Sequence, residues 1–68
     1  MRFFLKQFFQ ITLVSEDGPQ NIEFHGTAYQ AEKAFFALSF ALCESAYTEM
    51  YLFAGEFQIN KTTFTKVR

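Results

Sequence analysis

Apolar and polar residues alternate along the first part of the chain. Between Phe3 and Val14, one set of alternate positions is apolar apart from Gln7, whereas the other set mixes polar residues with phenylalanine. A period of two is typical of a half-buried β-strand, because successive side chains point to opposite faces of a sheet. The side chains predicted to face the core are Phe3, Leu5, Phe9, Ile11 and Leu13.

A turn and a second strand follow this run. Residues 15–19, Ser-Glu-Asp-Gly-Pro, combine an Asp-Gly step, which supplies a residue with positive φ, with a proline that interrupts strand pairing. Residues 21–25 alternate again, and we expect Ile22 and Phe24 to point inward and Glu23 outward. The two runs therefore predict a β-hairpin.

The next segment has the signals of a helix. Thr27 followed by Gln30 has the spacing of a capping box at a helix N-terminus. The sequence after it is rich in alanine and other strong helix formers. The helix is predicted to begin at Ala28 and to fade between Ser45 and Tyr47, where residues typical of strands take over.

Two apolar stripes run along this predicted helix, on nearly opposite sides at about 100° per residue. An alanine-rich stripe lets a helix approach a sheet closely, whereas large rings leave gaps against a sheet already rich in phenylalanine. We therefore expect the first stripe to face the sheet and the second to face outward. The first comprises Ala31, Ala34, Phe35, Leu38, Ala41 and Leu42, and the second comprises Tyr29, Phe36, Phe40, Cys43 and Tyr47.

The C-terminal third returns to strand patterns. Residues 49–54 predict a third strand, and Gly55-Glu56 is a plausible two-residue turn. Residues 57–60 predict a fourth strand, with Phe57 and Ile59 on one face. The order ββαββ indicates an α+β fold in which one helix packs on one face of a mostly antiparallel sheet.

Two further points bound the architecture. Asn60-Lys61 is another turn signal, so a fifth strand over residues 62–67 stays an open alternative. The 68 residues, with eleven phenylalanines and three tyrosines, are expected to form one domain over residues 1–68. A domain of this size buries only about 60% of its unfolded surface, and large rings concentrate that burial in few positions.

Little in the sequence supports catalysis or metal binding. Cys43 and His25 are the only thiol and the only imidazole, and no third group is placed to orient such a pair. Reactive thiols need an electropositive setting, whereas Cys43 follows an apolar run. Glu44 and Glu49 lack partners at a metal-site spacing. We predict a protein that is not an enzyme, with no catalytic residues, no cofactor and no metal.

The cysteine count and the apolar runs bear on location. A lone cysteine is typical of a reducing compartment. Residues 34–43 form the longest uncharged apolar run, which is shorter than the roughly 20 residues that span a bilayer. Residues 1–10 are interrupted by polar side chains, and no small-residue cleavage site follows them. We expect a soluble protein in the cytoplasm of the producing or host cell.

The net charge of −1 conceals a segregation of charges. All seven acidic residues lie between residues 7 and 60, where Lys33 is the only basic residue, and the other five bases lie at the two ends. If the terminal strands are neighbours, one edge of the sheet is basic. Such an edge either prevents edge-to-edge pairing of strands or steers a partner electrostatically.

Basic and aromatic residues also interleave near the chain ends. Sheets that bind single-stranded nucleic acid combine exposed rings with positive charges, so nucleic-acid binding is an alternative function. Five bases in a net-acidic domain give few contacts to phosphates. The residues of this alternative site are Arg2, Phe4, Lys6, Phe8, Lys66 and Arg68.

The decapeptide at residues 25–34, HGTAYQAEKA, resembles the strand-to-helix entry of very small α+β proteins. These include small proteins of phages and mobile elements, among them several anti-CRISPR proteins. The resemblance covers residues 20–60 as architecture, and it implies a non-enzymatic inhibitor that blocks a host nucleoprotein complex by occluding its surface. Such inhibitors share no site motif, so the resemblance transfers no functional residue.

The surplus aromatic stripe of the helix is the main functional signal. Buried aromatic anchors dominate the energy of protein interfaces, so we predict a small protein-binding module. Its partner is expected to be a larger protein or nucleoprotein complex, or a second copy in a homodimer. A homodimeric structural subunit of a larger assembly is a further alternative. The predicted contact residues are Tyr29, Phe36, Phe40 and Tyr47.

Overall fold

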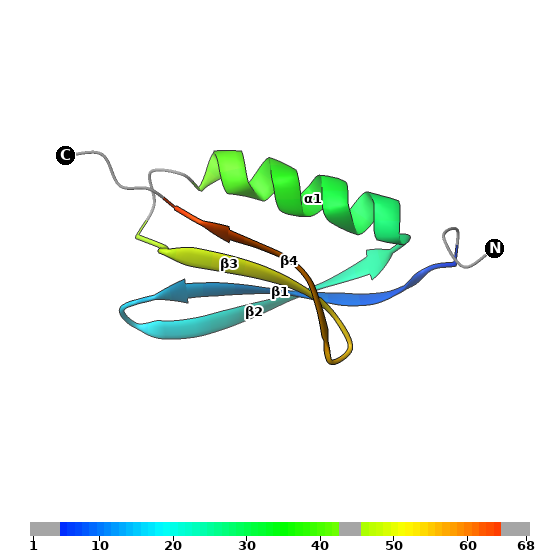
Figure 1. Ribbon diagram of the computed structural model, residues 1–68, viewed down its shortest axis with the longest axis horizontal. Helices are drawn as coiled ribbons and strands as arrows, with labels where there is room; N and C mark the ends of the chain where they lie inside the picture. The colour runs from blue at the N-terminus through cyan, green and yellow to red at the C-terminus, as the bar shows by residue number, and fades with distance from the viewer. Residues whose placement is uncertain (1–4, 43–45, 65–68) are drawn as a thin grey trace.

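One helix packs on one face of a four-stranded antiparallel sheet (Figure 1). The computed structural model describes residues 5–42 and 46–64. Its elements are β1 (Gln7–Ser15), β2 (Gly18–Gly26), α1 (Ala28–Ala41), β3 (Glu49–Ala54) and β4 (Phe57–Thr63). The strand order is β2-β1-β3-β4, and each neighbouring pair is antiparallel. The predicted α+β arrangement in the order ββαββ is confirmed.

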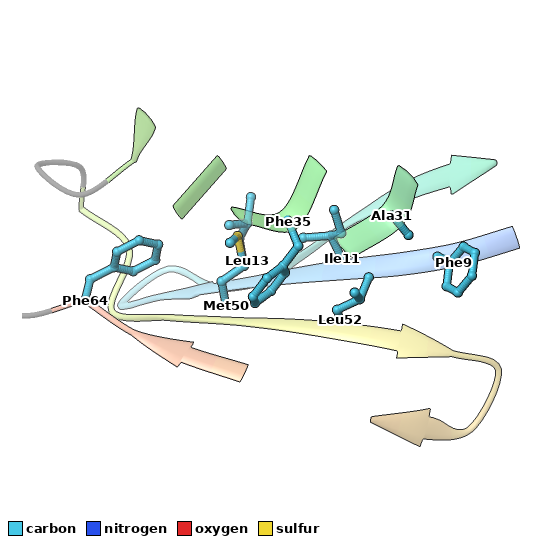
Figure 2. Close-up of a cluster of buried hydrophobic side chains, with 8 residues drawn as sticks. All are labelled: Phe9, Ile11, Leu13, Ala31, Phe35, Met50, Leu52 and Phe64. Carbon is cyan, nitrogen blue, oxygen red and sulfur yellow. The ribbon is translucent and has the colours of Figure 1, made fainter. Parts of the chain in front are cut away.

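The core lies between α1 and the sheet face that it covers (Figure 2). Alternate residues of the central strands β1 and β3 point toward the helix, as the period of two predicts. Phe35 reaches from the helix to the sheet, and Ala31 allows the close approach of the two layers. The buried cluster consists of Phe9, Ile11, Leu13, Ala31, Phe35, Met50, Leu52 and Phe64.

The two hairpin turns are as predicted in position and chemistry. Gly18 has φ +106° and Gly55 has φ +62°, which are backbone conformations that side chains with a Cβ rarely adopt. Pro19 does not end the pairing, because it lies within β2 and pairs with Val14. A proline is tolerated there because β2 is an edge strand, which need not donate a hydrogen bond on its open side.

The helix begins as the sequence predicts and ends earlier. The Gln30 backbone N–H donates to Thr27 Oγ1 at 3.2 Å, and the Thr27 N–H donates to Gln30 Oε1 at 3.0 Å, so the capping box is complete. The helix ends at Ala41, with Leu42 as its C-cap, rather than near Ser45–Tyr47. Its 14 residues span about 21 Å.

Two side chains predicted to point inward lie largely outside the core. Leu5 is 59% exposed because it precedes β1, beyond the last residue of β2 that could flank it. Ile22 pairs with the buried Ile11 but is 42% exposed, because β2 is at the edge of the sheet. Phe24, by contrast, is partly buried and packs against the core as predicted.

The last strand differs most from its prediction. β4 continues through Asn60 and Lys61 to Thr63, so the described residues hold neither a turn at that step nor a fifth strand. A register shift between Leu52 and Phe53 places a bulge in β4, which interrupts the alternation that the sequence suggested for its first residues. Phe57 pairs with Ala54 next to the hairpin turn, before the bulge, and is 78% exposed.

Candidate interaction surfaces

The outward side of α1 carries a continuous row of large side chains, which we call the helix surface. Tyr29 is 69% exposed, Phe36 63% and Phe40 69%. The rings of Phe36 and Phe40 meet edge to face with their centroids 5.6 Å apart. Lys33 completes the row, with its Nζ 5.2 Å from the centre of the Tyr29 ring. The helix surface is thus defined as Tyr29, Lys33, Phe36 and Phe40.

The rotation of α1 about its axis fixes this surface on the solvent side. Ala31 and Phe35 are buried against the sheet on the opposite side of the helix. Asn60 Nδ2 of β4 donates to Glu32 Oε1 at 3.1 Å, which ties one flank of the helix to the sheet. The expected orientation, with the alanine-rich stripe inward, is therefore correct at these positions. Ala41 is the exception, because it is exposed near the end of the helix.

One predicted contact residue was placed wrongly. Tyr47 does not belong to the helix surface, because the helix ends before it and Tyr47 lies in the connection to β3. Its ring is partly buried against the core, and its hydroxyl donates to Gln20 Oε1 at 2.6 Å. Cys43, also assigned to the outward stripe, lies outside the described residues. Lys33 was not among the predicted contacts, although its spacing of four from Tyr29 indicates it.

The sheet face away from the helix forms a second aromatic surface, which we call the open sheet face. Phe8 is 67% exposed, and its ring centroid lies 4.5 Å from that of His25 on β2. Tyr51 and Phe53 of β3 stack with centroids 6.0 Å apart. Lys61 Nζ of β4 lies 5.5 Å from the centre of the Tyr51 ring. Phe8 and Tyr51 thus have partners on neighbouring strands, whereas Phe53 contacts a ring of its own strand.

Polar interactions also cover the open sheet face. Gln10 and Thr12 of β1 donate to Asn21 Oδ1 of β2, at 3.3 Å and 2.9 Å. The Tyr51 hydroxyl donates to Glu49 Oε1 at 2.7 Å. This hydrogen bond, with smaller contributions from burial and from the negative charge of Glu49, raises the pKa of Tyr51 above its ordinary value. Much of this face is therefore engaged within the chain.

The residues of the nucleic-acid alternative are only partly described. Phe8 lies on the open sheet face, and Lys6 is exposed just before β1. The premise of a basic edge is wrong, because β3 separates β1 from β4 and the terminal strands are not neighbours. The remaining residues of that site, which lie outside the described part of the chain, are Arg2, Phe4, Lys66 and Arg68.

A hollow of about 170 Å³ lies beside Phe8 and is lined also by Phe9, Gln10, Glu23 and Gly55, whereas small-molecule sites usually enclose about 300–1,000 Å³. Within residues 5–42 and 46–64, no three His, Cys, Asp or Glu side chains gather as metal ligands would. Of the Cys43–His25 pair, the structure describes His25, whereas Cys43 lies outside the described residues. No described helix has the length and apolar character needed to cross a membrane.

Comparison with known proteins gives no relative from which a role could be transferred: no family model, curated protein or solved structure matches the chain.

Proposed function

We propose that this protein is a small protein-binding module that contacts its partner through the helix surface. The observation that carries the proposal is that Tyr29, Phe36 and Phe40 are each about two-thirds exposed in one row on a helix fixed to the sheet. Soluble monomers rarely expose large continuous apolar patches unless those patches bind something. Aromatic side chains are also enriched among the residues that dominate interface energies.

Two features of the helix surface suit a protein partner. The rings are held on a preformed helix, so binding does not have to order the backbone that carries them. Lys33, the one charge in the row, lies between the rings, and its ammonium group contacts the ring of Tyr29. A partner would therefore bury the rings and offer this ammonium group a favourable neighbour, such as the face of an aromatic ring.

The test compares the wild-type protein with the double variant Phe36→Glu/Phe40→Glu. Both residues are exposed, so the variant is expected to keep the wild-type circular dichroism spectrum and to melt within a few degrees of it. Proteins retained by the immobilised wild type from a lysate of the encoding organism are identified, purified and titrated by calorimetry. The double variant is expected to bind at least about 100-fold more weakly, since central aromatic anchors contribute about 2 kcal/mol or more each.

A matched variant controls for the effect of adding carboxylates. Phe57→Glu changes an equally large ring, 78% exposed, at the start of β4, and is expected to bind as the wild type does. Equal binding by the double variant, or its loss of folded structure, contradicts the proposal. The narrower form suggested by the HGTAYQAEKA segment is an inhibitor whose partner is a nucleoprotein complex, and the same titration against such a complex tests it.

Single-stranded nucleic acid is a second candidate, with the open sheet face as its site. The observation that favours it is the exposed Phe8 ring beside His25, next to the Tyr51–Phe53 pair. Glu23 and Glu49 are acidic neighbours in the same strands, and phosphates are bound through positive charge. A salt titration with a labelled oligonucleotide decides this candidate, which fails if no binding is seen at low salt.

A further inference from the structure

The helix surface has a spacing that is the same in both directions along the helix. Tyr29, Lys33, Phe36 and Phe40 are separated by four, three and four residues, which is the alternating spacing of the a and d positions in a heptad repeat. A helix that runs in the opposite direction presents the same row of positions. In a two-fold pair of antiparallel helices each contact occurs twice, and this spacing sets every position of the row opposite another position of the row.

We propose that the partner of the helix surface is a second copy of this chain, with the two α1 helices packed antiparallel about a two-fold axis; the inference rests on the proposed function. In this arrangement Tyr29 of one copy lies opposite Phe40 of the other, and Lys33 lies opposite Phe36. The outer pair of positions is about 16 Å apart along the helix axis. The contact therefore fits within the 14 residues of α1.

Charge selects the antiparallel direction over the parallel one. Lys33 is the only charged residue in the row. Parallel helices in register would place the two Lys33 ammonium groups against each other, and like charges at close range repel. Antiparallel helices place each ammonium group beside the Phe36 ring of the other copy, where a cation–π contact is favourable. A single lysine at such a position in a helix pair is also known to fix register.

The flanks of the row leave room for the rings of a second copy. Ala37 and Ala41 are both exposed and small, so a ring from the facing helix can enter beside them as a knob enters a hole. Gln30, on the same flank, is uncharged and its side-chain oxygen caps the helix. On the other flank, the Glu32 carboxylate accepts a hydrogen bond from Asn60. Neither flank sets like charges against each other.

The size of the contact indicates a modest affinity. Three rings, each about two-thirds exposed, together with the Lys33 stem and the alanine methyl groups, bury on the order of 1,000 Å² over both copies, since an aromatic side chain offers about 150–250 Å². That area is at the low end for specific interfaces. Because α1 is already folded on its sheet, we expect a dimer with a dissociation constant on the order of 10 µM.

Sedimentation equilibrium of the full chain tests the self-association. Between about 1 and about 500 µM the wild type is expected to pass from monomer to dimer, as a dissociation constant of this order requires. Phe36→Glu is expected to weaken the dimer at least about 30-fold, by loss of a central anchor. Phe57→Glu is the control, since the β3–β4 hairpin lies away from the outer side of α1 (Figure 1), and it should leave the dimer unchanged. A dimer whose dissociation constant is unchanged by Phe36→Glu overturns the proposal.

Cysteine cross-linking tests the direction of the two helices. In a Cys43→Ser background, a chain with Tyr29→Cys is mixed with a chain with Phe40→Cys and oxidised at high concentration, so that Lys33 and Phe36 stay in place. The antiparallel pair predicts a mixed disulfide dimer that exceeds either homodimer. A parallel pair would instead cross-link each chain to a copy of itself, and that result overturns the proposed arrangement.

The outcomes separate this inference from the function on which it rests. A wild type that is folded and monomeric up to the highest concentration overturns self-pairing, while binding to another protein through Phe36 and Phe40 would still stand. Phe36→Ala, which adds no charge, guards against a folding defect specific to the glutamate. If both Phe36 variants unfold, the ring belongs to the fold, and the self-pairing and the protein-binding function are both overturned.

Discussion

The helix surface and the open sheet face differ in how their rings are engaged within the chain. On the open sheet face, Phe8 lies against His25, and Tyr51 contacts Phe53, Glu49 and Lys61. Among the described residues, α1 itself supplies the ring contacts of the helix surface, Phe36 with Phe40 and Tyr29 with Lys33, and all three rings remain about two-thirds exposed. Strands bring rings together across the sheet, whereas a single helix supplies neighbours only along its own axis. Aromatic content alone therefore does not identify a binding surface.

The sharpest test of the comparison uses two adjacent phenylalanines of α1. Phe35 is 2% exposed and Phe36 is 63% exposed. Phe35→Ala should lower the free energy of unfolding by about 3–5 kcal/mol, through lost burial and a cavity. Phe36→Ala, measured on monomeric protein, should change it by no more than about 0.5 kcal/mol. Urea denaturation at low protein concentration measures both, and similar losses would show that the helix surface is part of the core.

A smaller difference is expected between the rings of the two surfaces. Tyr51→Ala removes a stacked ring, a cation–π contact and a hydrogen bond, and should lower the free energy of unfolding by about 1–2 kcal/mol. Phe40→Ala removes only an edge-to-face contact within the helix, and should cost about 0.5 kcal/mol or less. The same denaturation experiment ranks the two variants. If Phe40→Ala instead lowered the free energy of unfolding more than Tyr51→Ala does, the rings of the open sheet face would contribute less to stability than those of the helix surface.

The smallest effect concerns the titration of Tyr51. Its hydrogen bond to Glu49 raises its pKa above the ordinary value, which is about 10. The folded state therefore binds the phenolic proton more tightly than the unfolded state does. The resulting stabilisation is fully present below the unfolded pKa and is lost as the pH rises through the folded pKa.

Ultraviolet absorbance measures this titration directly. One of the three tyrosines should ionise at a higher pH than an ordinary tyrosine, and Glu49→Gln should return that component toward the ordinary value. Glu23→Gln, which removes an acid from another strand, is the matched control and should leave the titration unchanged. A wild-type curve with no late component would show that the open sheet face is less engaged than its geometry indicates.

Local signals in the sequence predicted most of the fold because short-range chemistry determines them. The Thr27–Gln30 capping box fixes the start of α1, and Gly18 and Gly55 provide the positive φ that two tight turns require. The buried positions of β1 and β3 follow from strict alternation. The outward orientation of Tyr29 and Phe36 followed from helical periodicity combined with the expectation that small residues face a sheet rich in large ones.

The errors arose where the position depends on distant parts of the chain. The sequence predicts Tyr47 on the helix, but the helix ends at Ala41, and Tyr47 packs against the core and contacts Gln20. Ile22 has the pattern of a buried residue, yet β2 is an edge strand. The alternative of a turn at Asn60-Lys61 fails for the same reason, because pairing with Tyr51 keeps Lys61 within β4.

The sequence by itself determined the order of the elements, their turns and caps, and the two faces of the helix, because these depend on residues a few positions apart. Only the tertiary structure decided which aromatic residues pack within the chain and which remain exposed. The strand order β2-β1-β3-β4 set His25 beside Phe8 and Lys61 beside Tyr51 on the open sheet face, and it drew Tyr47 toward the core. The same packing left Tyr29, Phe36 and Phe40 exposed in one row. That distinction depends on contacts between segments far apart in the chain, which periodicity does not encode.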